Sequence, residues 1–109
     1  MLRTPDDRIT THPGEILKEE FLAEFGLSAN KLAQAIDVPT NRVTAILHGR
    51  RNVTPDTALR LARFFGTTPE FWMNLQASHD LSKAKVEVAA AIEKTVKPMN
   101  DPAAQAATT

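Results

Sequence analysis

The stretch DVPTNRVTAILHGRR, residues 37–51, decides the fold of this chain. Its apolar side chains Val43, Ile46 and Leu47 recur at the spacing that puts them on one face of an α-helix. The proline before them suits a helix start, and the glycine after them suits a helix end. Small polar side chains occupy the opposite face, and two arginines follow directly. The stretch therefore predicts a helix with one buried face and one face free to form hydrogen bonds.

A second helix is predicted immediately before this one, over residues 28–36, SANKLAQAI. Only three residues, DVP, connect the two helices, and a connection this short makes helices cross steeply, as in a helix-turn-helix. Ala33 supplies the small side chain that the crossing requires. Asp37 stands where the turn needs a residue that accepts positive φ, a place usually taken by glycine. The sequence thus predicts a helix-turn-helix over about residues 28–48.

The remaining segments also read as helices, and no strand or hairpin signal occurs. Apolar residues recur at helical spacing over 13–25. The tripeptides TPD (54–56) and TPE (68–70) open two more helices in the same way, with threonine as cap, proline at the first position and an acid in the first turn. Residues 79–97 either continue the last of these helices or form a sixth.

The predicted fold class is accordingly all-α, within a chain of 109 residues that corresponds to one domain. The predicted organisation is a flexible N-terminus over 1–11, a helix-turn-helix domain over 12–78, a C-terminal helix over 79–97 and a flexible tail over 98–109. Nothing in the sequence reads as a signal peptide or a membrane span, so we expect a cytoplasmic protein.

Catalytic and metal-binding functions are poorly supported. The chain has no cysteine, and His12, His48 and His79 lack the spacing of metal ligands. No glycine-rich loop that could cradle a phosphate occurs. We therefore expect no catalytic residues, no metal and no cofactor.

Charge is distributed unevenly along the chain, although the formal net charge is zero. Residues 39–65 contain five arginines and one acidic residue. Arginine pairs with phosphate through two hydrogen bonds, and a local basic patch matters more for nucleic-acid binding than the total charge. Arg60 and Arg63, three residues apart, are expected on a solvated helix face instead. This distribution favours double-stranded DNA as a partner.

The predicted contacts follow from the way a helix-turn-helix enters the major groove, with the start of its second helix nearest the bases. The expected base-contacting residues are Thr40, Asn41, Arg42, Thr44 and Ala45. The expected phosphate-contacting residues are Ser28, Ala29, Arg50, Arg51 and Asn52. Phosphate contacts set register and affinity, whereas base contacts set sequence preference.

Large apolar side chains near the start of the last predicted helix suggest a second copy of the chain as a partner. Phe71, Trp72 and Leu75 are a heavy apolar load for so small a core. The alternative is that all of them lie in the core. A two-fold dimer would present two recognition helices to half-sites about 34 Å apart, one turn of DNA.

The motifs HPGE, VPTNRV, TPDTALRLARFFGTTPEFW and NLQ, spread over about residues 12–81, together resemble one known family. They are similar to the HigA-type antitoxins of bacterial toxin–antitoxin modules, which are phage-repressor-like helix-turn-helix proteins of the Xre class. Asp37 departs from the turn glycine that is usual there.

The resemblance implies a five-helix repressor-like DNA-binding domain that acts as a homodimer. It also implies an antitoxin that binds the operator of its own operon, represses it, and neutralises a RelE-like, mRNA-cleaving toxin. Acidic side chains at Glu15, Glu19, Glu20 and Glu24 could meet a basic toxin surface. Two other functions stay open: a repressor without a toxin partner, and a protein-interaction module that no longer binds DNA.

Overall fold

The computed structural model describes residues 9–100, so most of the two predicted flexible ends, at 1–8 and 101–109, lies outside the described residues. The elements are α1 (Pro13–Ile16), η1 (Leu17–Leu22), α2 (Ala23–Phe25), α3 (Ala29–Ile36), α4 (Thr40–Leu47), α5 (Pro55–Phe65) and α6 (Pro69–Thr95). The first three join into one rod whose middle, η1, is a π-helix. The chain therefore has five helical rods and no strand between residues 9 and 100, which confirms the all-α fold class.

Side-chain caps fix where these helices begin. The hydroxyl oxygens of Ser28, Thr54 and Thr68 accept hydrogen bonds from the backbone N–H groups three residues later, at 3.1, 3.4 and 3.1 Å. Such bonds satisfy N–H groups that the first turn of a helix leaves unpaired. The repeated Thr-Pro-acid motif thus begins both α5 and α6 as predicted, with the threonine as the N-cap and the proline and the acidic residue in the first turn.

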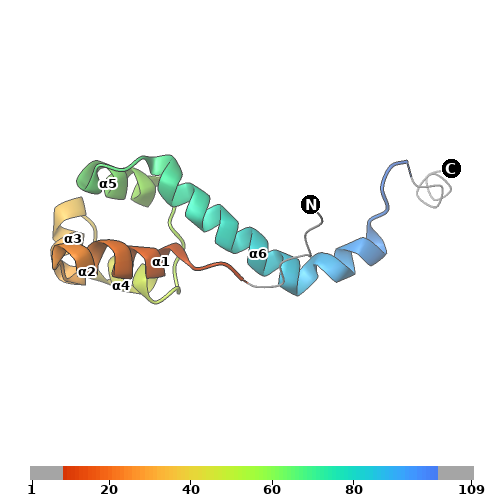
Figure 1. Ribbon diagram of the computed structural model, residues 1–109, viewed down its shortest axis with the longest axis horizontal. Coiled ribbons are helices and arrows are strands. Elements are labelled where there is room, and N and C mark those ends of the chain that lie inside the picture. The colour runs from red at the N-terminus through yellow and green to blue at the C-terminus, as the bar shows by residue number, and fades with distance from the viewer. Residues whose placement is uncertain (1–8, 101–109) are drawn as a thin grey trace.

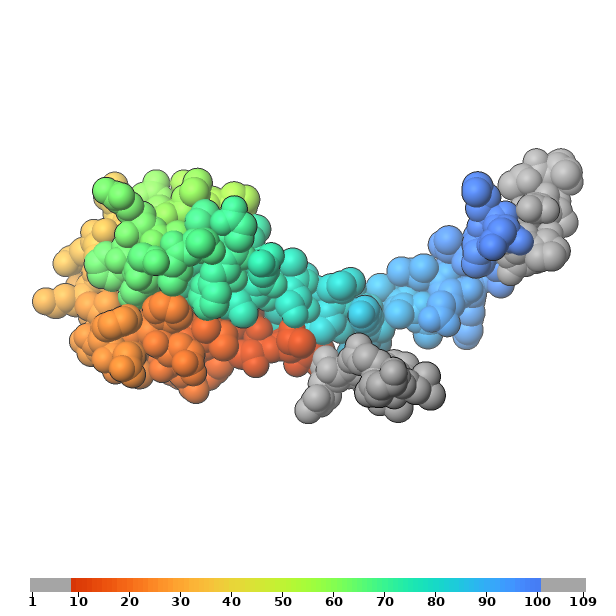
Figure 2. All heavy atoms as spheres, turned by 45° about the horizontal axis from the view of Figure 1, so that its top comes forward, coloured from red at the N-terminus to blue at the C-terminus, as the bar shows by residue number. Residues whose placement is uncertain are grey.

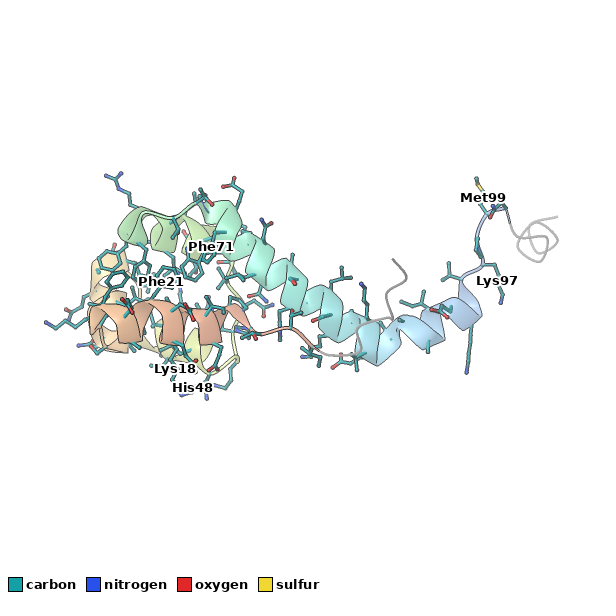
Figure 3. The ribbon with its side chains drawn as sticks, viewed as in Figure 1. Lys18, Phe21, His48, Phe71, Lys97 and Met99 are labelled. Carbon is teal, nitrogen blue, oxygen red and sulfur yellow. The ribbon has the colours of Figure 1, made fainter. Side chains whose placement is uncertain are left out.

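The core lies where α1–η1–α2 faces α4 and α6, with α3 packed on α4 and α5 packed on α6 (Figure 1). Phe21 of η1 and Phe71 of α6 point toward one another across this space, with ring centroids 6.1 Å apart (Figure 3). Phe21 also packs on Phe65 and Trp72, at 4.8 and 5.0 Å. The buried apolar residues are Leu17, Leu22, Leu32, Ala33, Ile36, Val43, Ile46, Val53, Ala58, Leu61, Ala62 and Trp72.

Residues 79–95 continue α6 rather than forming a separate helix, so the predicted junction at 78/79 falls inside one helix of 27 residues. The second half of α6 projects beyond the body of the protein (Figures 1 and 2). Its apolar side chains Leu81, Val88 and Ile92 are exposed. Within residues 9–100, no helix, α6 included, combines the length and the apolar character needed to span a bilayer.

Candidate nucleic-acid interface

The turn between α3 and α4 has the geometry predicted for it. Asp37 adopts the left-handed conformation, with φ 59° and ψ 53°, and is the only non-glycine residue with positive φ in the described part of the chain. The N–H of Asp37 donates to the carbonyl of Gln34 at 3.3 Å, and the N–H of Val38 donates to that of Ala33 at 3.0 Å. These bonds close α3 and direct the chain straight into α4.

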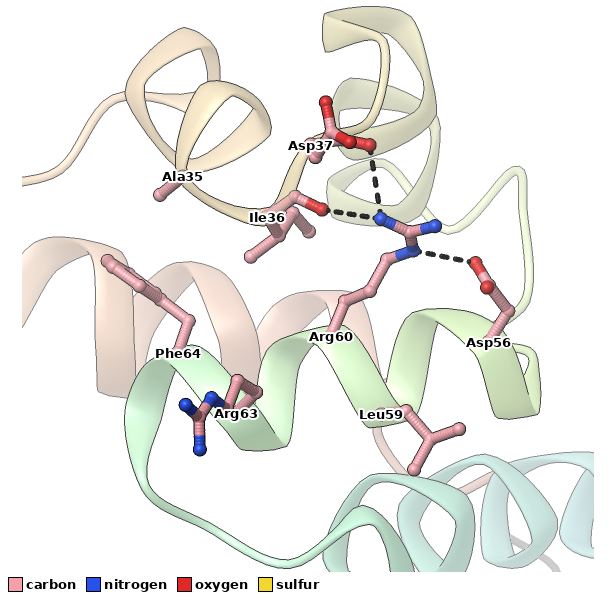
Figure 4. Close-up of a pocket in the computed structure, with 8 residues that line it drawn as sticks. All are labelled: Ala35, Ile36, Asp37, Asp56, Leu59, Arg60, Arg63 and Phe64. Atoms are coloured by element: carbon pink, nitrogen blue, oxygen red, sulfur yellow. Dashed lines mark hydrogen bonds and ion pairs between the residues drawn. The ribbon is translucent and has the colours of Figure 1, made fainter.

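A side chain from α5 holds this turn from the other side (Figure 4). One guanidinium nitrogen of Arg60 donates to the carbonyls of Ile36 and Asp37, at 2.9 and 3.2 Å. Its Nε donates to the carboxylate of Asp56 at 2.9 Å. Arg60 thus satisfies carbonyls that the last turn of α3 leaves free. The prediction of a solvated face is confirmed for Arg63, which is exposed. The side chain of Arg60 is 37% exposed, but it also lies over the turn, because α5 packs on α3.

The predicted base-contacting residues lie outside the core-facing side of α4: Thr40 and Asn41 are exposed, and Arg42, Thr44 and Ala45 are half-buried. The hydroxyl of Thr40 donates to the side-chain oxygen of Asn30 in α3 at 2.9 Å. The hydroxyl of Thr44 donates to the backbone carbonyl of Asn41 at 3.2 Å. Hydrogen bonds therefore fix the side chains of Thr40 and Thr44. The side-chain amide of Asn41, in the first turn of α4, is exposed.

The hydrogen bond between Thr40 and Asn30 also brings the first turns of α3 and α4 side by side. The predicted phosphate-contacting residues Ser28 and Ala29 therefore lie next to the start of α4. Ser28 is exposed, and its hydroxyl oxygen already caps α3 by accepting from the N–H of Lys31. What remains for an anion at this end of α3 is the backbone N–H groups of the first turn and the helix dipole.

Arg42 is placed differently from the other predicted base-contacting residues. Its Nη1 lies 3.4 Å from the same carboxylate oxygen of Asp56 that Arg60 binds. The side chain is 27% exposed, and its Nε is buried without a hydrogen-bond partner in the described structure. The hydrogen bond from Arg60, followed by the charges of Arg60 and Arg42, holds the pKa of Asp56 below its ordinary value. In the free protein Arg42 is thus turned toward α5.

The loop after α4 carries the other predicted phosphate-contacting residues, Arg50, Arg51 and Asn52, all exposed. Its first part is anchored to α4, because the N–H groups of Arg50 and Arg51 donate to the carbonyl of Ala45 at 2.8 and 3.2 Å. The three side chains therefore project from a loop of defined shape at the C-terminal end of α4.

Gln76 anchors the far end of this loop, a role that the sequence reasoning missed. Its side-chain oxygen accepts from the N–H of Val53 at 2.7 Å, and its amide donates to Asp80 at 2.9 Å. The side chain is 4% exposed. Gln76 could have been found from the sequence, because it is a polar residue of the NLQ motif on the apolar face of the last predicted helix. A polar side chain that is buried needs a hydrogen-bond partner.

The HPGE motif, residues 12–15, packs α1 against α4. A Cβ atom on Gly14 would overlap the backbone carbonyl of Ile46, so only glycine allows α1 to lie this close. Nδ1 of His12 accepts from the N–H of Gly14 at 2.9 Å and caps α1. Burial, then the charge of His79, lowers the pKa of His12. Among residues 9–100 there is no group of three His, Asp or Glu side chains placed to hold a metal ion.

Two of the three residues predicted for a dimer interface are at least partly exposed to solvent. Phe71 is 37% exposed, and Leu75 is half-buried. Trp72 is 0% exposed, and its indole donates to the hydroxyl of Thr67 at 2.8 Å. The assignment of Trp72 to a subunit interface is therefore wrong: the ring fills the space beside Phe21 and belongs to the core.

This geometry agrees with the matches to known proteins. The helix-turn-helix family matches residues 17–72. Virulence-associated protein I of Dichelobacter nodosus is 49% identical over 74 residues, which are 68% of this chain and 68% of that protein. The fold, the exposed face of α4 and the family match define the chain as a helix-turn-helix DNA-binding regulator.

Two solved structures refine that class. A HigA-family antidote protein from Coxiella burnetii has 58% identity and a TM-score of 0.77, over 81% of this chain and 96% of that one. The antitoxin HigA of Pseudomonas aeruginosa, solved with the higBA promoter, has 41% identity and a TM-score of 0.81, over 84% and 99%. The chain belongs to the HigA-type antitoxin family of helix-turn-helix proteins.

Proposed function

We propose that this protein binds the operator of its own toxin–antitoxin operon as a homodimer, represses that operon, and neutralises a RelE-like, mRNA-cleaving toxin. The observation that carries the proposal is the outward row of polar side chains on α4, in a fold that matches a HigA antitoxin solved with its promoter. Repression follows from occupancy, since a dimer on the operator blocks polymerase. We place the protein in the cytoplasm, where such an operator lies.

In this proposal α4 lies in the major groove with Asn41 facing a base, because Asn pairs through two hydrogen bonds with adenine. Thr40, Thr44 and Ala45 line the groove beside it and contact base edges or a thymine methyl group. Arg50, Arg51 and Asn52 bind phosphates from the loop, and Ser28 and Ala29 bind them from the start of α3.

Two variants separate base reading from phosphate binding. Asn41→Ala should weaken binding to the DNA upstream of the protein's own gene by about 1–3 kcal/mol, with little effect on mixed-sequence DNA. Arg50→Ala should weaken both equally and reduce the slope of log affinity against log salt by about one. Fluorescence anisotropy over a salt series measures both quantities.

The matched control for Asn41→Ala is Asn74→Ala, which removes an exposed side-chain amide from α6. If Asn41→Ala keeps wild-type affinity and sequence preference, α4 is not the reading face. If the wild-type protein binds no DNA, the interaction-module alternative replaces the proposal.

The toxin is proposed to contact the acidic rod formed by α1, η1 and α2. The side chains of Glu15, Glu19, Glu20 and Glu24 are exposed there. A hydrogen bond with Glu15, and then its charge, raises the pKa of Glu19, so a cationic partner would relieve repulsion within the rod.

Co-purification with the product of the neighbouring reading frame tests the partnership. Charge reversal at Glu19 and Glu20 should abolish it, and intact binding would move the toxin surface elsewhere. If no neighbouring reading frame encodes a toxin, the alternative function, a repressor without a toxin partner, replaces the antitoxin part of the proposal.

A further inference from the structure

Asp56 is shared unequally by two arginines. Arg60 makes the shorter contact, 2.9 Å, and is further fixed by the carbonyls of Ile36 and Asp37. Arg42 makes the longer one, 3.4 Å, beyond the usual length of a charge-assisted hydrogen bond. Arg42 is also the side chain that comes from the recognition helix. Of the two arginines, Arg42 is therefore the one that can leave.

We infer that Asp56 is a counter-charge latch: it holds Arg42 on α5 in the free protein and gives it up to an acceptor on DNA. The inference rests on the proposed DNA binding and adds a residue outside α4 that sets its strength. Asp56 itself touches no DNA in this scheme. It acts through Arg42, and its effect is to weaken binding to every DNA sequence. The contacts made by the rest of α4 then decide which DNA sequence the protein prefers.

The exchange is easy in both directions because neither group is left without a partner. When Arg42 leaves, Asp56 keeps the hydrogen bond and the charge of Arg60. Meanwhile the Nε of Arg42, which is buried without an acceptor in the described structure, can gain one from a phosphate or a base edge. A carboxylate held by Arg42 alone would resist the same move, since its charge would lose its only counter-ion.

The direction of the effect separates a latch from a structural ion pair. If the contact between Arg42 and Asp56 merely stabilised α4 against α5, its removal would loosen the recognition helix and weaken DNA binding. If Asp56 competes with DNA for Arg42, its removal strengthens binding. The side chain of Asp56 is 59% exposed and that of Arg42 is 27% exposed, so the contact between them lies at the protein surface, where Arg42 can exchange Asp56 for an acceptor on DNA.

The experiment compares wild type, Asp56→Asn, Arg42→Gln and the double variant on a mixed-sequence DNA fragment and on the DNA upstream of the gene. Asp56→Asn should bind the mixed-sequence fragment about three- to fivefold more tightly, the scale of an exposed ion pair. In the Arg42→Gln background the same substitution should have no such effect. Asp56→Ser is a second neutral variant that tests the same point should the asparagine variant fold poorly.

Glu70→Gln is the control that the chain offers, because Glu70 occupies the equivalent place in the Thr-Pro-Glu opening of α6. It removes one negative charge without touching Arg42 and should leave binding within experimental error. Weaker binding by Asp56→Asn, or an equal gain in the Arg42→Gln background, overturns the latch while leaving the proposed function intact. Failure of the wild type to bind either DNA overturns both.

Discussion

Single contacts decide how the ends of α4 are held. Gly14 lets α1 lie against the carbonyl of Ile46, His12 caps α1 through Nδ1, and Asp37 supplies the left-handed residue of the turn. Each contact depends on one property of its residue. Gly14 has no side chain, His12 has a ring nitrogen that accepts a hydrogen bond, and Asp37 tolerates positive φ. Substitutions at these positions should therefore have specific and separable effects.

Gly14→Ala should destabilise the protein by about 1–3 kcal/mol, because the new methyl group must displace the backbone of Ile46 or α1. Chemical denaturation measures this free energy of unfolding. Gly26→Asn is the control at the other end of the same rod: Gly26 follows α2 in the left-handed conformation that Asn tolerates, and a Cβ atom there would have open space around it. Equal stability of wild type and Gly14→Ala would show that α1 is not pressed against α4.

Acidification should weaken the fold through His12. Its folded pKa lies below the ordinary value of 6.5, so the unfolded chain binds the proton more readily. The stabilising effect is present above about pH 6.5 and is lost as the pH falls through the lowered folded pKa, because protonated Nδ1 no longer accepts from Gly14.

Denaturation at pH 7.5 and at lower pH measures this loss. His12→Asn keeps an oxygen that can cap α1 without titrating, so the variant should lose less stability on acidification. An identical pH dependence in the two proteins would assign the effect to other groups.

Helix α6 does more than complete the core. Its first turns bury Trp72, and its next turn sends Gln76 to the loop that carries Arg50 and Arg51. The proposed dimer surface and the proposed phosphate-binding loop are thus joined by one helix turn. A change in α6 can therefore reach the DNA-facing side through Gln76.

Gln76→Leu should cost about 1–3 kcal/mol, since it leaves the buried N–H of Val53 without an acceptor. It should also speed hydrogen exchange at Val53 and weaken binding to any DNA sequence, because the loop that carries Arg50 loses its anchor. Exchange measured by NMR and DNA anisotropy give the two readouts. Asn74→Leu, exposed on the same helix, should change neither. Unchanged exchange at Val53 in Gln76→Leu would refute the anchor.

The molecule as a whole consists of a packed body and the projecting half of α6 (Figure 2). With Trp72 in the core, the predicted interface residues that keep apolar area for a second copy are Phe71 and Leu75. A dimer is needed to engage two half-sites about 34 Å apart, so subunit contact and DNA affinity should be lost together.

The double variant Phe71→Glu, Leu75→Glu should be monomeric in analytical ultracentrifugation and should bind operator DNA far more weakly than the wild type. Circular dichroism checks that it remains helical. Phe25→Glu is the control, since Phe25 is 60% exposed but lies outside the proposed interface. A variant that stays dimeric would place the subunit contact elsewhere, for instance on the exposed half of α6.

The local signals in the sequence were enough to predict where the five helical rods begin and the turn between α3 and α4, but they left open whether residues 79–97 continue α6 or form a sixth helix. Apolar spacing, the Thr-Pro caps and the short connection all act over a few residues, so they can be read without knowing what packs on what. Asp37 was identified as the left-handed residue for the same reason.

The tertiary structure alone decided the partners of side chains that come together from distant positions. Arg60 binds the end of α3, Arg42 turns toward Asp56, Gln76 reaches Val53, and Trp72 is buried rather than free for a partner. A sequence gives the charge and the apolar character of these residues but not the face that their helix turns to its neighbours. That orientation is set by how the five rods pack, and it separates a reading side chain from one that holds the fold together.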